Sequence, residues 1–139
     1  MATRLEGWEE RLAVVIEAAR TTPYSLGEHD CWSVACATIA ALTGGDHWPE
    51  FAGKYKTKKQ ALALIATYGN SWQEAFAAFL GVQPISPLMA RRGDLVTYED
   101  DNGKHMGICL GTHVAVLGEK GLASVPITSP ALLEAWRIG

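Results

Sequence analysis

A stretch of ten residues without a charged side chain, SVACATIAAL at positions 33–42, constrains this fold more than any other feature of the chain. Small or apolar side chains would cover every side of a helix with this sequence, and a helix that is apolar all round is buried. Thr43, Gly44 and Gly45 follow directly and are typical of a helix end. We therefore predict a helix buried in the core.

The turn before this helix, YSLGEHD at positions 24–30, places Cys31 at the helix N-terminus. There, unpaired backbone N–H groups and the helix dipole favour the thiolate, so we expect a lowered pKa and a reactive thiol. A free cysteine on a buried helix otherwise behaves as a small apolar side chain. The local sequence leaves both interpretations open. We expect Asp30 to cap the helix and His29 to pack at the turn or bond its backbone.

The length of 139 residues predicts a single domain over residues 1–139. Hydrophobic residues make up 48% and charged residues 19% of the chain, as in a globular protein. A net charge of -3 offers no basic surface for nucleic acid. No apolar run is long enough to span a bilayer, and residues 1–6 lack the layout of a signal peptide. We expect a soluble protein without a nucleic-acid partner or a membrane span.

The elements change from helices to strands near Pro84. Apolar spacing predicts a helix over 5–19, and capping boxes beginning at Thr57 and Ser71 predict two more, up to about 68 and 81. The later pattern predicts strands over 94–98, 106–110, 113–117 and 122–127. Asp100-Asp101-Asn102-Gly103 predicts a hairpin turn, and Ser129-Pro130 a closing helix. Helices followed by an antiparallel meander indicate the α+β class.

A cysteine nucleophile needs a base, and His105 begins a predicted strand. Strand alternation places His105, Gly107 and Cys109 on one face, and the more apolar Met106 and Ile108 on the core face. His105 should then point toward a small-residue side where a helix or a cleft lies. A zinc site built from the cysteines and histidines stays open, but the paired short spacings of structural zinc sites are absent, so we predict no metal.

Three short segments resemble the NlpC-like papain-fold cysteine peptidases, which cut peptide crosslinks in bacterial cell walls. The first, TPYSLG at positions 22–27 followed by Asp30-Cys31, is similar to the family's turn before the nucleophile. The second, RGDLV at 92–96, is similar to the strand before the histidine strand. The third, HMGICLG at 105–111, is similar to the histidine strand itself. The resemblance implies a papain-like fold, with N-terminal helices packed on a C-terminal antiparallel sheet.

The resemblance also implies roles for single residues. Cys31 corresponds to the nucleophile, His105 to the general base, and Tyr24 to a tyrosine that lines the active site and whose hydroxyl helps bind the oxyanion. The family's third polar group would fall near Val116 and Leu117, which are apolar. His113 or Thr112 substitutes for it only if the strand bends. No cofactor is implied.

Within this superfamily, the chain resembles more closely a small branch encoded among bacteriophage tail genes, which shares the ending AWR, here 135–137. This resemblance implies a tail-tip protein, made in the host cytoplasm and carried in the virion tail. Its partners would be other tail-tip proteins and, if it is active, peptidoglycan peptides cleaved during genome entry. The alternative is a catalytically inactive structural component of the tail tip. A third and weaker option is a host-derived enzyme that depends on a metal or a thiol.

Overall fold

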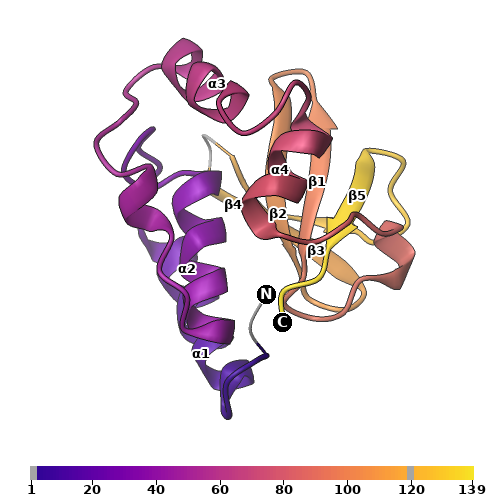
Figure 1. Cartoon of the computed structure of the whole chain (residues 1–139). Coiled ribbons are helices and arrows are strands. Elements are labelled where there is room, and N and C mark those ends of the chain that lie inside the picture. Colours follow the sequence, from indigo (N-terminus) through magenta and orange to yellow (C-terminus); the bar gives the residue numbers. More distant parts are fainter. Residues whose placement is uncertain (1–2, 119–120) are drawn as a thin grey trace.

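The computed structural model describes residues 3–118 and 121–139, and over these residues the protein is of the α+β class. Figure 1 shows the helices gathered on one side of an antiparallel sheet. The described helices are α1 (Trp8–Thr21), α2 (Cys31–Thr43), α3 (Lys58–Ala66) and α4 (Trp72–Leu80), with short 3-10 helices η1 (Trp48–Glu50) and η2 (Pro87–Met89). The described strands are β1 (Leu95–Asp100), β2 (Gly103–Cys109), β3 (His113–Gly118), β4 (Gly121–Pro126) and β5 (Leu132–Trp136).

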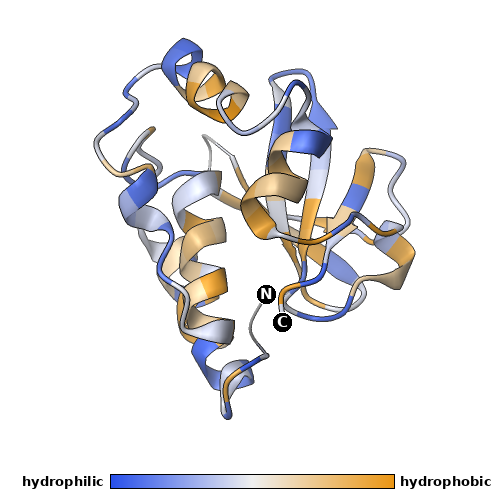
Figure 2. Ribbon diagram, in the orientation of Figure 1, coloured by the Kyte–Doolittle hydropathy of each residue, from blue (hydrophilic) through white to orange (hydrophobic). Residues whose placement is uncertain are grey.

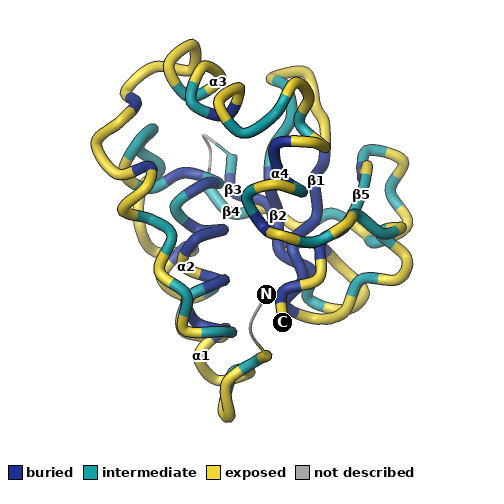
Figure 3. The backbone as a smooth tube through the Cα atoms, in the orientation of Figure 1, coloured by how far each residue is buried: buried dark blue, intermediate teal, exposed yellow. Residues whose placement is uncertain are grey.

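The buried helix predicted from the uncharged stretch is confirmed as α2. Ile39 and Leu42 are fully buried, and Figure 2 shows this helix in white and orange, without hydrophilic blue. By contrast, Ile65 is the one buried residue of α3 among those described, and Figure 3 shows α3 largely exposed. The helix at the centre of the core is therefore α2.

The five described strands are ordered β4-β3-β2-β1-β5, and all their pairings are antiparallel. The predicted hairpin turn is confirmed, because Asp100 pairs with Gly103 across a two-residue loop. Gly103 has a φ of 111°, which an L side chain rarely adopts. The predicted turn between β3 and β4 includes residues 119–120, which lie outside the described residues.

The predicted closing helix is wrong, because residues 132–136 form strand β5. β5 pairs with the edge of β1 that β2 leaves free, and it buries Ala135 and Trp136 completely. The indole N–H of Trp136 donates to the Thr97 hydroxyl at 2.9 Å. Pairing with an open sheet edge thus outweighs the local helix-start signal of Ser129-Pro130.

The two faces of the sheet carry separate apolar clusters. Leu95, Met106 and Ile108 pack with the helices, whereas Val96, Tyr98 and Cys109 pack on the opposite face. The alternation predicted for β2 is therefore confirmed. The helices, α2 included, lie on the Met106 face, so the side chain of His105 leaves β2 on the face opposite to α2.

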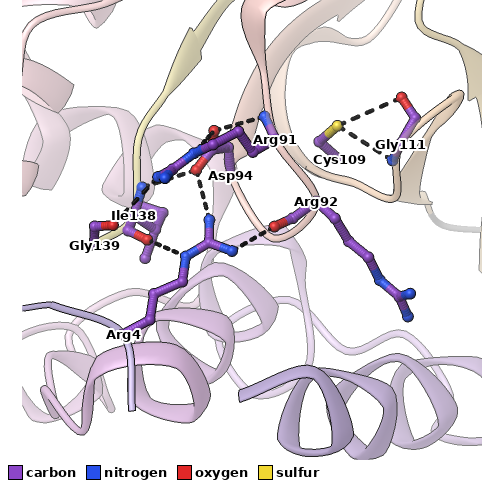
Figure 4. Close-up of polar contacts among 8 residues, drawn as sticks. All are labelled: Arg4, Arg91, Arg92, Asp94, Cys109, Gly111, Ile138 and Gly139. Carbon is purple, nitrogen blue, oxygen red and sulfur yellow. Dashed lines mark hydrogen bonds and ion pairs between the residues drawn. The ribbon is translucent and has the colours of Figure 1, made fainter. Parts of the chain in front are cut away.

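The two ends of the described chain meet at a buried carboxylate, shown in Figure 4. Asp94 is fully buried and forms an ion pair with Arg4 at 2.9 Å. Its oxygens also accept the backbone N–H groups of Ile138 at 3.0 Å and Arg91 at 2.8 Å. Arg4 in turn donates to the carbonyl of Ile138 at 2.8 Å. This arrangement fixes the N-terminal segment and β5 against the start of β1.

Candidate active site

The turn that leads into α2 is held by the carboxylate of Asp30. Its oxygens accept the N–H of Ser33 at 2.9 Å, the N–H of Gly27 at 2.8 Å and the hydroxyl of Tyr55 at 2.5 Å. The Ser33 hydroxyl oxygen accepts the N–H of Asp30 at 2.9 Å, which completes a capping box. The predicted cap is thus confirmed, and the same carboxylate also fixes the turn and the loop that carries Tyr55.

Gly27 is required at its position for two reasons. Its φ of 87° lies in the left-handed region, and a Cβ there would lie 2.5 Å from the Tyr55 carbonyl oxygen. The backbone of the Tyr55 loop therefore touches the turn directly. This close approach fixes the position of the residues just before Cys31.

Cys31 is the half-buried first residue of α2, and its thiol lies beside β2. The backbone N–H of Met106 lies close enough to the sulfur to lower the pKa of the thiol. That N–H points toward the β3 side of β2, yet β3 pairs with β2 only over Gly107–Cys109. The sulfur of Cys31 thus lies beside an N–H that falls outside the β2–β3 pairing, one residue after His105.

The sequence analysis predicts that the helix N-terminus lowers the pKa of Cys31, and this predicted direction is wrong. Burial raises the pKa of this thiol to about 11, and the nearby carboxylate of Asp30 contributes to the rise. The N–H groups of Met106, Cys31 and Trp32 lower the pKa but do not offset the loss of water. The resting side chain is therefore a neutral thiol at pH 7, and the helix N-terminus alone does not ionise it.

His105 is held by two residues of β1. Its Nε2 lies 2.9 Å from Oδ1 of Asp100, and its ring stacks on Tyr98 with the ring centroids 5.0 Å apart. The same Asp100 oxygen accepts the N–H of Asn102 at 2.8 Å, so the turn orients the carboxylate. An ionised carboxylate only accepts hydrogen bonds, so Nε2 carries the hydrogen and Nδ1 of the neutral ring has the free lone pair.

Asp100 is a site residue that the sequence analysis assigned only to the turn. Partial burial raises its pKa, but hydrogen bonds from Asn102 and His105 and the charge of Lys58 outweigh that effect, so its pKa lies below the usual value. The carboxylate is therefore ionised at neutral pH. The signal that identifies it is hairpin geometry, because a two-residue loop brings the end of one strand beside the start of the next.

Cys31 and His105 line the same cavity, whose volume is about 160 Å³. One wall comes from the turn and the helices and contains Tyr24, Trp32 and Trp72. The other wall is the tip of the β1–β2 hairpin, with Asp100, Lys104 and His105. Lys58 of α3 joins the two walls, because its Nζ donates to the carbonyl oxygen of Asn102. Cys31, Tyr24 and His105 thus line one cavity, while the alternation of β2 directs the His105 side chain to the face opposite to α2.

His113 and His29 do not join this cavity. His113 is exposed at the start of β3, where its Nδ1 lies 2.8 Å from the Thr112 hydroxyl. It lies beside the end of β2 opposite to His105, so the structure does not bring it to the position of a third group. The backbone of His29 pairs with Ser25, and its buried Nε2 has no hydrogen-bond partner. The third group was expected near Val116 and Leu117, and of these two apolar residues Leu117 lines the cavity.

Neither a metal-holding group of side chains nor a membrane-spanning helix is found among the described residues. Within residues 3–118 and 121–139, no three His, Cys, Asp or Glu side chains are grouped so that they could hold a metal ion. None of the described helices combines the length and the apolar character required to cross a bilayer.

A family model matches residues 3–138, and the chain belongs to that family, a domain of unknown function designated DUF6950. No curated protein matches the chain. The family match covers both walls of the cavity, from the turn before Cys31 to the hairpin that carries His105 and Asp100.

Proposed function

We propose that this protein is a cysteine hydrolase of peptide or amide bonds, with Cys31 as nucleophile and His105 as the general base and acid. The observation that carries the proposal is that Cys31 and the hydrogen-bonded pair of His105 and Asp100 line one cavity. A nucleophile, a base and a group that orients the base are the parts this chemistry requires. The resemblance of three segments to NlpC-like peptidases supports the same assignment.

The raised pKa of Cys31 determines how the reaction begins. Because the thiol is neutral, its proton must pass to Nδ1 of His105 as sulfur attacks the substrate carbonyl carbon. This step requires the imidazole, which leaves β2 on the face opposite to α2, to turn toward the sulfur within the cavity. The C–S bond forms, the carbonyl becomes an oxyanion, and the imidazolium is stabilised by the Asp100 carboxylate. His105 then gives the proton to the leaving amine while the C–N bond breaks. Water, deprotonated by His105, hydrolyses the thioester and restores the thiol.

The developing oxyanion has two donors on the helix side of the cavity. The backbone N–H of Cys31 is at the first position of α2, where N–H groups have no partner within the helix. The hydroxyl of Tyr24, which lines the cavity, is the second donor in this proposal. In this proposal Asp100 positions and stabilises His105, to which it is hydrogen-bonded.

For the biological setting, we propose a tail-tip protein of a bacteriophage that opens peptidoglycan during genome entry. Support comes from the similarity to the tail-gene branch at the Cys31 turn, the Asp94 strand and the C-terminal residues 135–137. In this proposal the protein works in the virion tail beside other tail-tip proteins, and cell-wall peptides are its substrate. An NlpC-like, papain-like arrangement of the α+β domain belongs to the same proposal.

Hydrolysis of purified peptidoglycan tests the activity. We expect release of soluble peptide fragments by the wild type and none by Cys31→Ala. Cys36→Ala is the matched control, because Cys36 is buried on the same helix and does not line the cavity. Equal release by the wild type and Cys31→Ala would remove the proposed activity on this substrate.

A second candidate function is that of a tail-tip component without turnover. It is favoured by the burial that raises the pKa of Cys31 to about 11, since a protonated thiol is a poor nucleophile. Virions that carry Cys31→Ala and still adsorb and infect normally would support this candidate. A loss of infection by assembled Cys31→Ala virions would support the enzyme.

A further inference from the structure

We propose that a second cleft, beside the turn that leads into α2, binds one sugar ring of the peptidoglycan glycan strand, an N-acetylhexosamine. This inference rests on the proposed function, since it extends the same substrate from its peptide to the glycan that carries the peptide. It starts from the side chains that line this cleft and from one residue that the cleft shares with the cavity beside Cys31.

The second cleft lies between the turn and the loop that begins with η1, and it is open at the surface, with a volume of about 570 Å³. Glu28 lines it from the turn, and Trp48 and Lys56 line it from the loop. The two segments are joined at Tyr55, whose hydroxyl donates to the buried carboxylate of Asp30 at 2.5 Å. The cleft is therefore formed before a ligand binds, and its open side leaves room for the rest of a polymer.

Trp48 gives the cleft an aromatic surface with a polar edge. The residue is half-buried against the core, and within the described part of the chain no second aromatic ring packs on its indole. Its indole N–H has no acceptor among the described residues and is not one of the buried atoms without a partner, so it stays in contact with solvent. A sugar ring has an apolar C–H face and a rim of hydroxyl groups, which match the indole face and its N–H donor.

Glu28 and Lys56 supply polar groups beside this indole. Within the described residues the Lys56 ammonium has no partner, and the Glu28 carboxylate accepts only a long hydrogen bond from the Ser25 hydroxyl at 3.5 Å. Sugar hydroxyl groups both donate and accept hydrogen bonds, so they can use a carboxylate acceptor and an ammonium donor at the same time. The two charges are opposite, so the cleft favours a neutral ring over an anion.

Leu26 connects this cleft with the site of the reaction, because it lines both cavities. In peptidoglycan the stem peptide is attached to the glycan by its amino-terminal end, so the acyl side of a stem bond leads toward the sugar. In the proposed reaction His105 gives a proton to the leaving amine, which places that amine on the hairpin side. The acyl half then lies on the side of the turn, and it passes Leu26 to reach Trp48.

Chitotriose, a linear trimer of N-acetylglucosamine, is the probe for this cleft, and Cys31→Ala is the background because it binds without turnover. We expect chitotriose to shift the NMR signal of the Trp48 indole N–H. Lys56→Met in this background should weaken binding by about 10-fold, as expected for the loss of a hydrogen bond to a charged group. Lys54→Met is the matched control, because Lys54 is exposed on the same loop and does not line the cleft.

Trp48→Leu should abolish chitotriose binding, and its urea denaturation shows whether the half-buried position tolerates the change. Lys56→Met keeps the test valid if Trp48→Leu does not fold. The absence of chitotriose binding by folded Cys31→Ala would overturn the inference. Equal binding by Lys56→Met and Lys54→Met would overturn it as well.

A comparison of two substrates separates the cleft from the hydrolase. One is a stem peptide that carries its disaccharide, and the other is the same peptide without the sugar. We expect the KM of the wild type to be about 10-fold lower for the first at similar kcat, and Lys56→Met to lose most of this difference. Hydrolysis of both with equal KM would overturn the inference and leave the hydrolase intact. Chitotriose binding without hydrolysis of either peptide would retain the cleft and reject the hydrolase.

Discussion

The two walls of the cavity hold their carboxylates in opposite ways. Asp30, beneath Cys31, is 2% exposed and accepts hydrogen bonds from a turn, a helix and a distant tyrosine. Asp100, beside His105, has a side chain that is 44% exposed and accepts from its own turn and from His105. The helix side is thus fixed by a buried network, and the hairpin side by local contacts at the surface. Substitutions on the first side should mainly reduce stability, and substitutions on the second mainly activity.

The largest effect is expected for Asp30→Ala. The variant loses a helix cap and leaves the Tyr55 hydroxyl and the Gly27 N–H without their acceptor, so we expect a loss of about 3–5 kcal/mol in the free energy of unfolding. Urea denaturation measures it. Asp100→Ala is the control and should lose less than about 1 kcal/mol, because its contacts are exposed. Similar losses in both variants would contradict the difference between the walls.

The next-largest effect on the free energy of unfolding is expected at alkaline pH. The pKa of Cys31 is about 11 in the folded protein and lower in the unfolded chain. The stability that the buried neutral thiol contributes is therefore fully present below about pH 9 and is lost as the pH rises through 11. Ionisation of this thiol should reduce the free energy of unfolding by up to about 3 kcal/mol. We expect a steeper loss between pH 9 and 11 in the wild type than in Cys31→Ala. Parallel stability curves for the two proteins would reject the raised pKa.

A smaller effect is expected when the stability losses of alanine substitutions at two glycines with similar backbone angles are compared. Gly27 and Gly53 have φ values of 87° and 74°, so an alanine at either position is strained by about 1–2 kcal/mol. Only at Gly27 would the added Cβ also collide with the Tyr55 carbonyl oxygen, since nothing lies near Gly53. Gly27→Ala should therefore lose at least about 1 kcal/mol more than Gly53→Ala by urea denaturation. A smaller loss at Gly27 would show that the Tyr55 loop moves away at little cost.

The smallest effect on stability, but a large one on activity, is expected for Asp100→Asn. The amide cannot stabilise the His105 imidazolium, so kcat should fall by about 10²-fold while the free energy of unfolding changes by less than about 1 kcal/mol. The pH dependence of kcat/KM should also shift, which a purely structural role would not cause. Asp100→Glu should restore part of the activity. An unchanged pH profile in Asp100→Asn would exclude the positioning role.

The helix wall was largely predictable from the sequence, because its signals are local. The uncharged stretch of α2, the cap at Asp30 and the position of Cys31 at the helix start are all encoded within a few residues. The hairpin turn is equally local, and it was predicted at the residues where the structure has it.

Features that depend on distant parts of the chain were not predictable in the same way. Strand β5 exists because β1 offers a free edge, and that edge is formed by residues far from Ser129-Pro130. The raised pKa of Cys31 results from burial against β2, which outweighs the local effect of the helix N-terminus. The pairing of Asp100 with His105 required the register of the hairpin, although the sequence shows both residues at its tip.

The most direct test of the central claim measures how fast Cys31 is acylated by 4-nitrophenyl acetate at pH 7. Mass spectrometry of the intact protein would follow the acyl adduct in the wild type, His105→Ala and the control His113→Ala. We expect acylation at least about 10²-fold slower in His105→Ala and unchanged in His113→Ala. Equal rates in the wild type and a folded His105→Ala would show that the thiol and the imidazole do not act together.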